Sequence, residues 1–381
     1  MTASNQYLHQ GYRQCSISVM DNIADPDISF DEKGICNYYY QYIEAEKGYV
    51  KKGEEGKAAF DNAVATMKKD GAGKKYDCIL GVSGGVDSTY LAYIASKAGL
   101  RVLCVHFDNG WNSELAVTNI ESIVSKLDFG LYTYVIDWPE FRDIQLAYFK
   151  ANVIDIEAVT DLAIFSALDI LCKKFGIKHI IDGRNVVTES VLPQSWFCKN
   201  MSNLKDIHAK HGTMKLKSYP IMSPVRRRVV DRVKPFTRWP ILNYITYIKA
   251  DAKRKIIDEL GWRDYGGKHY ESVFTRFYQG YILPEKFHVD KRKAHLSNLI
   301  FSGQITKEEA LKELAQPAYP AGLLQSDMEL VIKKLGFTQQ EFDEYIKAPP
   351  VPHNRYEMGI SIFDEYKFLR PLKKVFKRQR L

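Results

Sequence analysis

The sequence predicts an α/β protein with a doubly wound parallel sheet, and three observations support this. Short continuous apolar runs occur at 76–82, 101–107 and 131–136, as expected for parallel strands covered on both faces. Amphipathic helical patterns lie between these runs. A glycine turn at 83–88 joins the first run to the first helix. Alternating strands and helices favour a parallel sheet that binds ligands at the carboxyl ends of its strands.

The other elements follow in order. Residues 1–50 are rich in turn formers, and residues 51–70 have the pattern of a polar amphipathic helix. After the first strand and the glycine turn, Leu91 and Ile94 mark one face of a helix that stops at Gly99. We expect further elements between the remaining runs: helices at about 113–126, 139–151 and 160–175, and a strand at 178–182.

Beyond about residue 240 the pattern becomes helical, and Thr306 and Thr338 each begin a capping box. The sequence therefore predicts three regions: an N-terminal lobe, an α/β domain and a mainly helical C-terminal region, at 1–70, 71–240 and 241–381.

Composition sets broad limits. The 381 residues are 45% apolar and 26% charged, which is ordinary for a soluble globular protein. No apolar run is long enough for a membrane span and no signal pattern opens the chain, so we expect a cytoplasmic protein. The six cysteines do not resemble a secreted disulfide framework. The net charge of +8 is concentrated near 226–238 and 373–380, which fits a solvated basic face or the attraction of an anionic substrate or acidic partner.

The turn Ser83-Gly84-Gly85-Val86-Asp87-Ser88 is typical of an anion site, because backbone N–H groups and a helix dipole converge there. No lysine follows the glycines, which excludes the common G-x-x-x-x-G-K-[ST] loop. A carboxylate beside phosphates is expected to hold Mg²⁺, which makes Asp87 a candidate ligand. The alternative is a tight turn in which serine and aspartate only cap the helix.

This S-G-G-x-D-S pattern resembles the loop of the PP-loop ATP pyrophosphatases, which include NAD, GMP and asparagine synthetases and tRNA thiolases. The resemblance implies a PP-loop ATP-binding domain at 71–240. It also implies cleavage of ATP to AMP and pyrophosphate, with transient adenylation of an oxygen on the substrate.

Longer blocks resemble the N-acetyl sugar amidotransferases of the WbpG/PseA type, which act in surface-polysaccharide and O-antigen biosynthesis. These blocks lie at 107–117, 155–161, 188–196, 262–269, 271–276 and 290–297, and the resemblance spans about 12–315. It implies conversion of an acetamido group to an acetamidino group on a sugar that we expect to be nucleotide-linked. The amide oxygen would attack the α-phosphate of ATP, and ammonia would then displace AMP.

The resemblance and the positions at strand ends together give candidate roles. The loop residues Ser83 to Ser88 would hold phosphates, and Asp87 and Glu189 would share Mg²⁺. Glu189 could instead be a surface residue of a loop. The other nucleotide-binding candidates are Phe107, Asp108, Asp182, Gly183, Asn185, Lys291 and Arg292. Phe107 and Asp108 would contact adenine and ribose, and each lysine or arginine could equally be an ordinary surface residue.

Three further groups of residues are candidates for catalysis or for binding the sugar. Lys268, in a glycine-rich loop, could bring a cation onto the phosphates. Glu157 and Asp161 would share a helix face and could orient or deprotonate ammonia, or form a solvated acidic face. The candidate substrate-binding residues are Trp111, Asn112, Trp196 and His269. The two tryptophans could stack on the sugar or belong to the core.

The chain departs from the family pattern in the N-terminal lobe. Members of the family usually carry two C-x-x-C pairs that resemble a zinc site, but only Cys15 and Cys36 are kept here, with Ser18 and Tyr39 at the other positions. Because two thiolates do not make a closed zinc site, we expect no zinc. Leu162 also stands where many relatives are expected to have histidine.

The sequence has no signature of a glutaminase, so the resemblance implies HisH-like glutaminase and HisF-like ammonia-channelling partners. No nucleic-acid partner is expected. Two alternatives remain open. A PP-loop tRNA-modifying enzyme of the thiolase type would need a reactive cysteine, for which Cys198 is the one candidate near the predicted ligand face. The second alternative is a non-catalytic assembly subunit. The intact loop argues against it, because such a subunit would not need to bind ATP.

Overall fold

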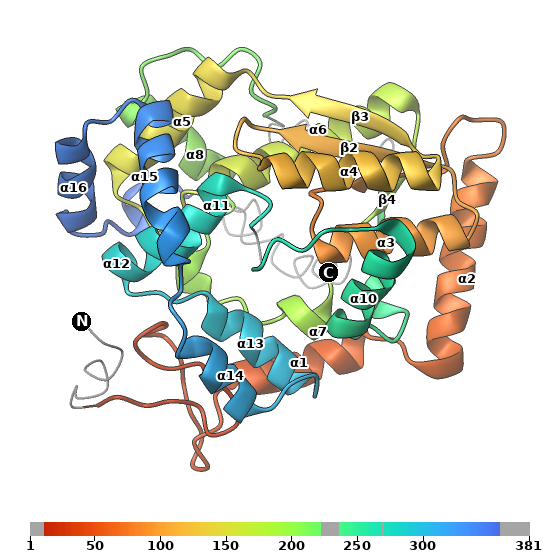
Figure 1. Cartoon of the computed structure of the whole chain (residues 1–381), viewed down its shortest axis with the longest axis horizontal. Coiled ribbons are helices and arrows are strands. Elements are labelled where there is room, and N and C mark those ends of the chain that lie inside the picture. The colour runs from red at the N-terminus through yellow and green to blue at the C-terminus, as the bar shows by residue number, and fades with distance from the viewer. Residues whose placement is uncertain (1–10, 222–235, 268–269, 359–381) are drawn as a thin grey trace, which may run out of the picture.

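The computed structural model describes residues 11–221, 236–267 and 270–358. Its five strands form one parallel sheet in the order β3-β2-β1-β4-β5 (Figure 1). The strands are β1 (Cys78–Gly81), β2 (Val102–Asp108), β3 (Gly130–Val135), β4 (His179–Ile181) and β5 (Thr237–Trp239). The chain first builds outward from β1 to β3 and then returns to add β4 on the other side of β1. This reversal confirms the predicted doubly wound sheet.

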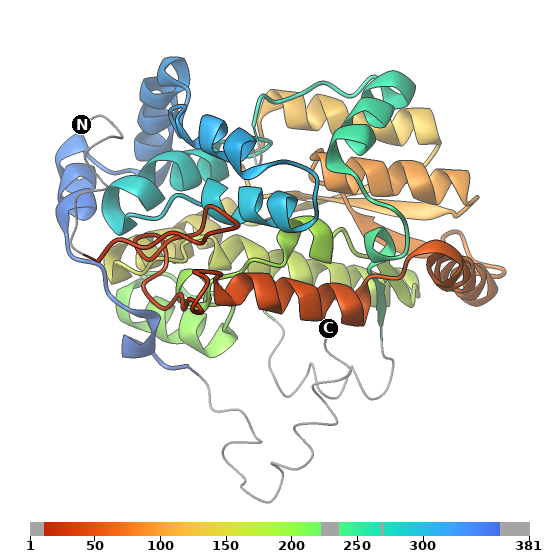
Figure 2. The same cartoon turned by 90° about the horizontal axis from the view of Figure 1, so that it is seen from below.

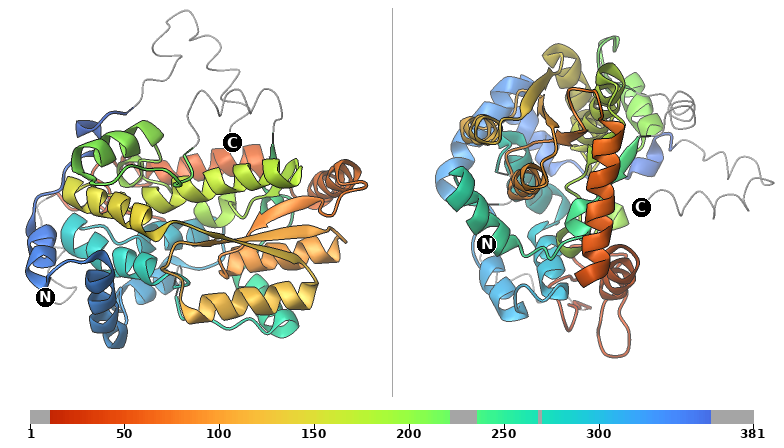
Figure 3. Two further views of the ribbon diagram at one scale, coloured as in Figure 1. Left: turned by 90° about the horizontal axis from the view of Figure 1, so that it is seen from above. Right: turned by 90° about the vertical axis from the view of Figure 1, so that its right-hand side faces the viewer.

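Helices cover both faces of the sheet (Figure 3, left). Leu80 of β1 belongs to an apolar cluster with Leu91 of α3, Ile120 of α4 and Ile256 of α10, while Ile79 packs with α6 on the opposite face. The alternation of side chains along a strand produces this division. The helices on these faces are α3 (Val86–Lys97), α4 (Glu114–Leu127), α6 (Ala158–Phe175) and α10 (Lys249–Leu260).

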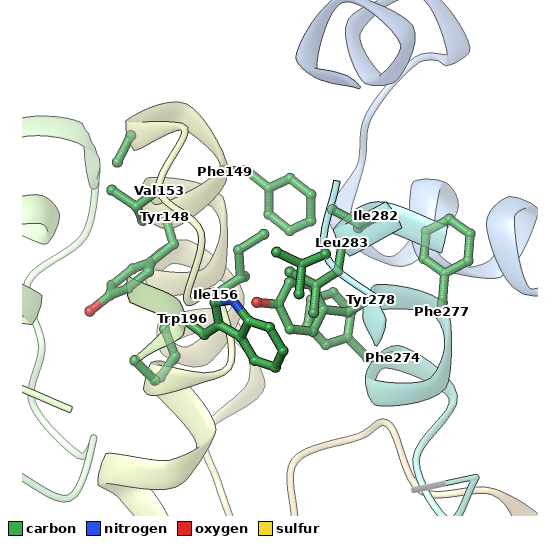
Figure 4. Packing of buried hydrophobic residues seen from close by; sticks show 14 of the residues in the cluster. Tyr148, Phe149, Val153, Ile156, Trp196, Phe274, Phe277, Tyr278, Ile282 and Leu283 are labelled. Atoms are coloured by element: carbon green, nitrogen blue, oxygen red, sulfur yellow. The ribbon is translucent and has the colours of Figure 1, made fainter. Parts of the chain in front are cut away.

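A second core lies beside the sheet, where α5 (Trp138–Ala151) and the N-terminal end of α6 meet the C-terminal helices. Phe149 of α5 packs against Phe274, and Trp196 lies nearby (Figure 4). The same core includes Cys15 and Cys36 of the N-terminal segment. The C-terminal elements are α11 (Val273–Phe277), a π-helical turn (Tyr278–Ile282), α12 (Leu283–Phe287), α13 (Arg292–Phe301), α14 (Lys307–Leu314), α15 (Ala321–Leu335) and α16 (Gln339–Lys347).

The capping boxes predicted at Thr306 and Thr338 are confirmed. The turn-rich N-terminal stretch, however, contains a helix that the sequence did not predict, α1 (Asn37–Tyr49). Its Tyr38 and Tyr42 are buried one turn apart, and α1 packs beside α7 (Val186–Glu189) and α13 (Figures 1 and 2). Tertiary packing thus outweighs the modest helix propensity of a tyrosine-rich segment.

Packing crosses the predicted domain boundaries, which remain a prediction. The predicted helix at 51–70 is α2 (Gly53–Asp70), and its Met67 joins the cluster that covers the sheet. Helix α10 from the C-terminal region covers the same face. The short edge strand β5 was not predicted, because three residues give too little pattern. None of the described helices has both the length and the apolar character needed to cross a lipid bilayer.

Candidate functional site

The glycine turn lies between the carboxyl end of β1 and the first turn of α3. Gly84 has φ +83°, a conformation that residues with a Cβ atom rarely adopt. A Cβ there would lie 2.5 Å from Tyr265 Oη and 3.1 Å from the carbonyl oxygen of Ala116. The Ser88 hydroxyl donates to the carbonyl of Gly85 at 3.2 Å. The turn therefore has the strand–turn–helix geometry of an anion cradle.

A distant segment holds this turn from outside. The indole N–H of Trp262 and the hydroxyl of Tyr265 both donate to the carbonyl of Gly84, at 2.7 and 2.8 Å. The carbonyl of Gly84 and the N–H of Gly85 belong to one planar trans peptide and point in opposite directions. Fixing the carbonyl outward thus turns the Gly85 N–H toward Ser83 Oγ, at 3.2 Å. The two aromatic residues orient a backbone donor of the cradle.

Asp87 lies in the first turn of α3 and accepts a hydrogen bond from the Tyr247 hydroxyl. Burial raises the pKa of Tyr247 strongly, and the negative charges of Asp87 and Glu189 raise it further. The phenol therefore stays protonated and donates to the carboxylate. The negative charges of Asp87 and Glu189 therefore both act on the Tyr247 hydroxyl, and Asp87 is hydrogen-bonded to it.

Glu189 ends the short helix α7, which side chains fix at both ends. Asn185 caps it by accepting from the Thr188 N–H at 2.8 Å. At the other end, Asn298 Oδ1 of α13 accepts from the Ser190 N–H at 3.0 Å, the Ser190 hydroxyl at 2.8 Å and the Val191 N–H at 2.9 Å. A buried amide of the C-terminal region thus positions the helix that carries Glu189.

The carboxyl end of β4 adds a cation that the sequence did not single out. The Arg184 guanidinium donates to Asp182 Oδ2 at 2.8 and 2.5 Å. The pKa of Arg184 is raised by that hydrogen bond and also by the charge of Glu189. Asp182 and Gly183 lie at this strand end as predicted, with Asp182 paired to arginine. The Arg184 guanidinium also lies over the ring of Phe165 in α6, 5.6 Å from its centroid.

The carboxyl end of β2 also carries its predicted residues. Asp108 Oδ1 accepts from the Gly110 N–H at 2.9 Å and from Asn112 Nδ2 at 3.2 Å. Asn112 also lies 3.3 Å from His106 Nε2. Phe107 is partly buried and stacks on Tyr134, with ring centroids 5.6 Å apart. Asp108, Asn112 and His106 thus form a polar edge on β2, the strand that pairs with β1.

Both tryptophans that could stack on a sugar lie in the core. Trp111 is 1% exposed, and its indole N–H donates to Gln145 Oε1 at 3.0 Å. Trp138 and Phe274 pack against its rings. Trp196 is 3% exposed and donates to the carbonyl of Ala24 at 2.8 Å. These contacts fit the packing interpretation rather than stacking on a substrate.

The two carboxylates proposed for ammonia each face a cation. Glu157 precedes α6 rather than lying within it, and its Oε2 accepts from Gln279 at 3.0 Å and lies 3.8 Å from Lys291 Nζ. Asp161, in the first turn, pairs with Lys199 at 2.8 Å. The pairing places Lys291 beside Glu157.

The guanidinium of Arg292 donates to Asp290 and to the carbonyls of Glu313 and Gln316 at the end of α14. These contacts give Arg292 a structural task. Lys268 and His269 lie outside the described residues, as does most of the basic segment at 226–238 and all of that at 373–380.

Among the described residues, no group of three or more histidine, cysteine, aspartate or glutamate side chains could hold a metal ion. Mg²⁺ differs from zinc in this respect, because it commonly takes one or two carboxylates and completes its shell with water and substrate phosphates. Asp87, in the glycine turn, and Glu189, whose charge also acts on Tyr247, are two carboxylates of the kind that this coordination needs.

Five residues around the cradle were not predicted as site residues: Tyr247, Trp262, Tyr265, Glu271 and Asn298. Glu271 approaches the turn closely, since a Cβ on Gly85 would lie 3.4 Å from its Oε1. Trp262, Tyr265 and Glu271 stand in sequence blocks with a family resemblance, which could have pointed to them. Tyr247 and Asn298 carry no local signal.

Two family models match the chain. Residues 271–371 match the LPS biosynthesis protein WbpG-like, C-terminal domain. Residues 77–221 match the queuosine biosynthesis protein QueC. No curated protein matches the chain.

Solved structures resemble it weakly. An NMN synthetase from Francisella tularensis has 17% identity and a TM-score of 0.29, and the match covers 35% of this chain and 57% of that one. The chain thus spans little more than half of that synthetase. An NH3-dependent NAD synthetase from Campylobacter jejuni subsp. jejuni has 15% identity and a TM-score of 0.30. The match covers 53% of this chain and 83% of that one.

Proposed function

Because the chain belongs to the PP-loop ATP pyrophosphatases and carries a WbpG-like C-terminal domain, we propose that it is an ATP-dependent sugar amidotransferase. In this proposal it converts the acetamido group of a nucleotide-linked sugar to an acetamidino group in lipopolysaccharide biosynthesis. One observation carries the proposal. The cradle has Asp87 where a phosphate-binding lysine would be expected, and residues of the C-terminal half hold both the cradle and Glu189.

The chemistry requires an activated amide, because nitrogen donation makes an amide carbonyl a poor electrophile. The amide oxygen attacks the α-phosphorus of ATP, the bond to the β-phosphate bridging oxygen breaks, and pyrophosphate leaves. Ammonia then adds to the imidate carbon, AMP departs with the former amide oxygen, and a proton passes from nitrogen to a base. Every atom of the acetamido group except its oxygen remains on the sugar.

The chain's residues have defined tasks in this sequence. The backbone donors of the turn, with Ser83 and Ser88, hold the leaving pyrophosphate in line. Asp87 and Glu189 would hold Mg²⁺, which when bound neutralises charge on the phosphates. Arg184, at the end of β4, is placed for an anionic group of ATP or of the sugar carrier. We propose that Glu157 and Asp161 lie too close to lysines to act as free bases.

The nitrogen source in this proposal is a separate HisH-like glutaminase, with a HisF-like subunit that delivers ammonia. The isolated chain is then expected to use ammonium salts and to be inactive with glutamine alone. Glutamine-dependent turnover by the isolated chain would remove the need for these partners.

The direct test incubates UDP- and CMP-linked acetamido sugars with the chain, ATP, Mg²⁺ and ammonium, and analyses the products by mass spectrometry. Replacing C=O by C=NH lowers the sugar mass by about one dalton and adds a centre that is protonated at neutral pH. AMP and pyrophosphate should appear in equal amounts. The matched controls are Asp87→Asn and the exposed Asp61→Asn on α2. AMP release that depends on RNA instead of the sugar would favour the RNA-modifying alternative.

A further inference from the structure

Two turns of the N-terminal segment bring Cys15 and Cys36 together. The N–H of Cys15 donates to the carbonyl of Met20 at 2.9 Å and closes the first turn. The N–H of Ser16 donates to the carbonyl of Gly34 at 2.9 Å, which joins the first turn to the second. Both cysteines are fully buried. The backbone thus holds two sulfur atoms, twenty-one positions apart in sequence, in one place.

Hydrogen-bond donors converge on the sulfur of Cys15. The N–H of Cys36 donates to Cys15 Sγ at 3.3 Å, and the two cysteine side chains are hydrogen-bonded to each other. Ser18 Oγ lies 3.9 Å from Cys36 Sγ, which places a hydroxyl beside the pair. Such donors stabilise a thiolate over a thiol.

The hydrogen bond from Cys36 is the largest cause that lowers the pKa of Cys15, to about 5, and it outweighs the effect of burial. The same contact raises the pKa of Cys36. Within the pair, Cys36 therefore holds its proton more tightly than Cys15 does. A thiolate next to a thiol is the arrangement in which a first oxidation can be completed as a disulfide.

The other cysteines differ. Burial raises the pKa of Cys104 and Cys172 to about 12 and that of Cys198 to about 11, and it raises that of Cys78 as well. Cys78 and Cys104 lie inside strands of the sheet between its helical layers. Cys15 and Cys36, by contrast, lie in the turns of the N-terminal segment, where the N–H of Cys36 reaches Cys15 Sγ. These contacts place the two sulfur atoms of the pair beside each other.

We propose that Cys15 and Cys36 form a peroxide-sensitive thiol pair that closes to an intramolecular disulfide. The Cys15 thiolate attacks one oxygen of hydrogen peroxide, the O–O bond breaks, and a sulfenic acid forms as hydroxide leaves. The sulfur of Cys36 then attacks the sulfenic sulfur, the S–S bond forms, and water leaves with the thiol proton. The two sulfurs together lose two electrons, which reduce one peroxide. This site is independent of the proposed amidotransferase reaction.

The experiment treats the purified full-length chain with hydrogen peroxide at neutral pH, denatures it in an alkylating reagent and maps the peptides by mass spectrometry. A disulfide that links Cys15 to Cys36 should form about tenfold faster than oxidation of any other cysteine, since thiolate character sets the rate. Cys198→Ser, which removes a buried thiol elsewhere, should form the same disulfide.

Cys36→Ser supplies the second measurement. Without the resolving thiol, Cys15 should remain a sulfenic acid that dimedone traps. Alkylation of both cysteines as free thiols after peroxide would overturn the proposal, as would earlier oxidation of Cys198 or the sheet cysteines. The proposal would also be overturned if both thiols resisted peroxide and alkylation until a chelator was added. That result would mean that a bound metal ion occupies the two sulfur atoms. If Cys36→Ser does not fold, the peptide map of the unaltered chain decides the question alone.

Discussion

The glycine turn that we propose as a phosphate cradle and the residues that support it are built in opposite ways. The cradle, residues 83–88, is one continuous strand–turn–helix unit, and its chemical groups lie within six positions. Its support comes from Tyr247, Trp262, Tyr265 and Asn298, which are spread over fifty residues and arrive from a different part of the fold. The difference teaches that the reaction type is encoded locally, whereas the geometry of the reacting groups depends on long-range packing.

The largest effect is expected when the cradle itself loses its carboxylate. Asp87→Asn keeps the shape of the side chain but removes the charge that would hold Mg²⁺, so AMP and pyrophosphate release should fall about 10³-fold. Steady-state release of both products measures this. Asp61→Asn should leave the rate unchanged, and a fully active Asp87→Asn would contradict the role given to the cradle.

The next effect tests the contact between the two regions. Gly84→Ala places a Cβ against Tyr265 Oη and Ala116, and the left-handed backbone conformation itself costs about 1–2 kcal/mol. Gly303→Ala is the matched control, since Gly303 has φ +70° with no atom within 4 Å of the added Cβ. Thermal unfolding should show a larger loss for Gly84→Ala, and that variant alone should lose ATP cleavage. Equal losses in the two variants would mean that the close packing of Tyr265 on the turn is unimportant.

Removing a distant support should have a smaller effect on catalysis. Asn298→Ala leaves three donors of residues 190 and 191 without their acceptor, which should lower the free energy of unfolding by about 1–3 kcal/mol. Asn203→Ala is a control of similar burial that donates to the carbonyl of His353 away from the cradle. Both variants should be less stable, but Asn298→Ala should additionally raise the Mg²⁺ concentration needed for activity. If the Mg²⁺ requirement is unchanged, Asn298 does not position Glu189 for Mg²⁺ binding.

The smallest change removes one hydroxyl. Tyr247→Phe deletes the donor to Asp87 and should weaken Mg²⁺ binding about tenfold, as is typical for groups that orient a metal ligand. Calorimetric titration of Mg²⁺ into the chain with a non-hydrolysable ATP analogue measures this without turnover. Tyr90→Phe, whose ring lies 5.8 Å from that of Tyr247, should bind Mg²⁺ normally. Equal affinity in both variants would show that the hydroxyl does not position Asp87.

These two regions also explain what could be predicted from sequence. The parallel sheet, the turn at 83–88 and the position of Asp182 at a strand end followed from local patterns, because strand periodicity and glycine turns depend on neighbouring residues. The phenol of Tyr247 and the amide of Asn298 could not be found in this way, since each reaches its partner across more than one hundred positions of chain.

The two tryptophans, which the sequence assigns either to the sugar site or to the core, also depend on long-range packing. Trp111 and Trp196 stand in polar blocks that suggested contact with a sugar, yet each indole is buried with its N–H bonded to the protein. Single residues in a block can serve the core while their neighbours line a site. The strand-end residues Asp108 and Asn112, which flank Trp111, keep side chains that contact each other at the polar edge.

One isotope experiment tests the proposed reaction most directly. A substrate sugar labelled with oxygen-18 in its acetamido carbonyl is incubated with the chain, ATP, Mg²⁺ and ammonium, and the nucleotide products are analysed by mass spectrometry. If the amide oxygen attacks the α-phosphate, the label must appear in AMP, and pyrophosphate must be unlabelled. Unlabelled AMP, or release of ADP and labelled phosphate, would contradict activation by adenylation.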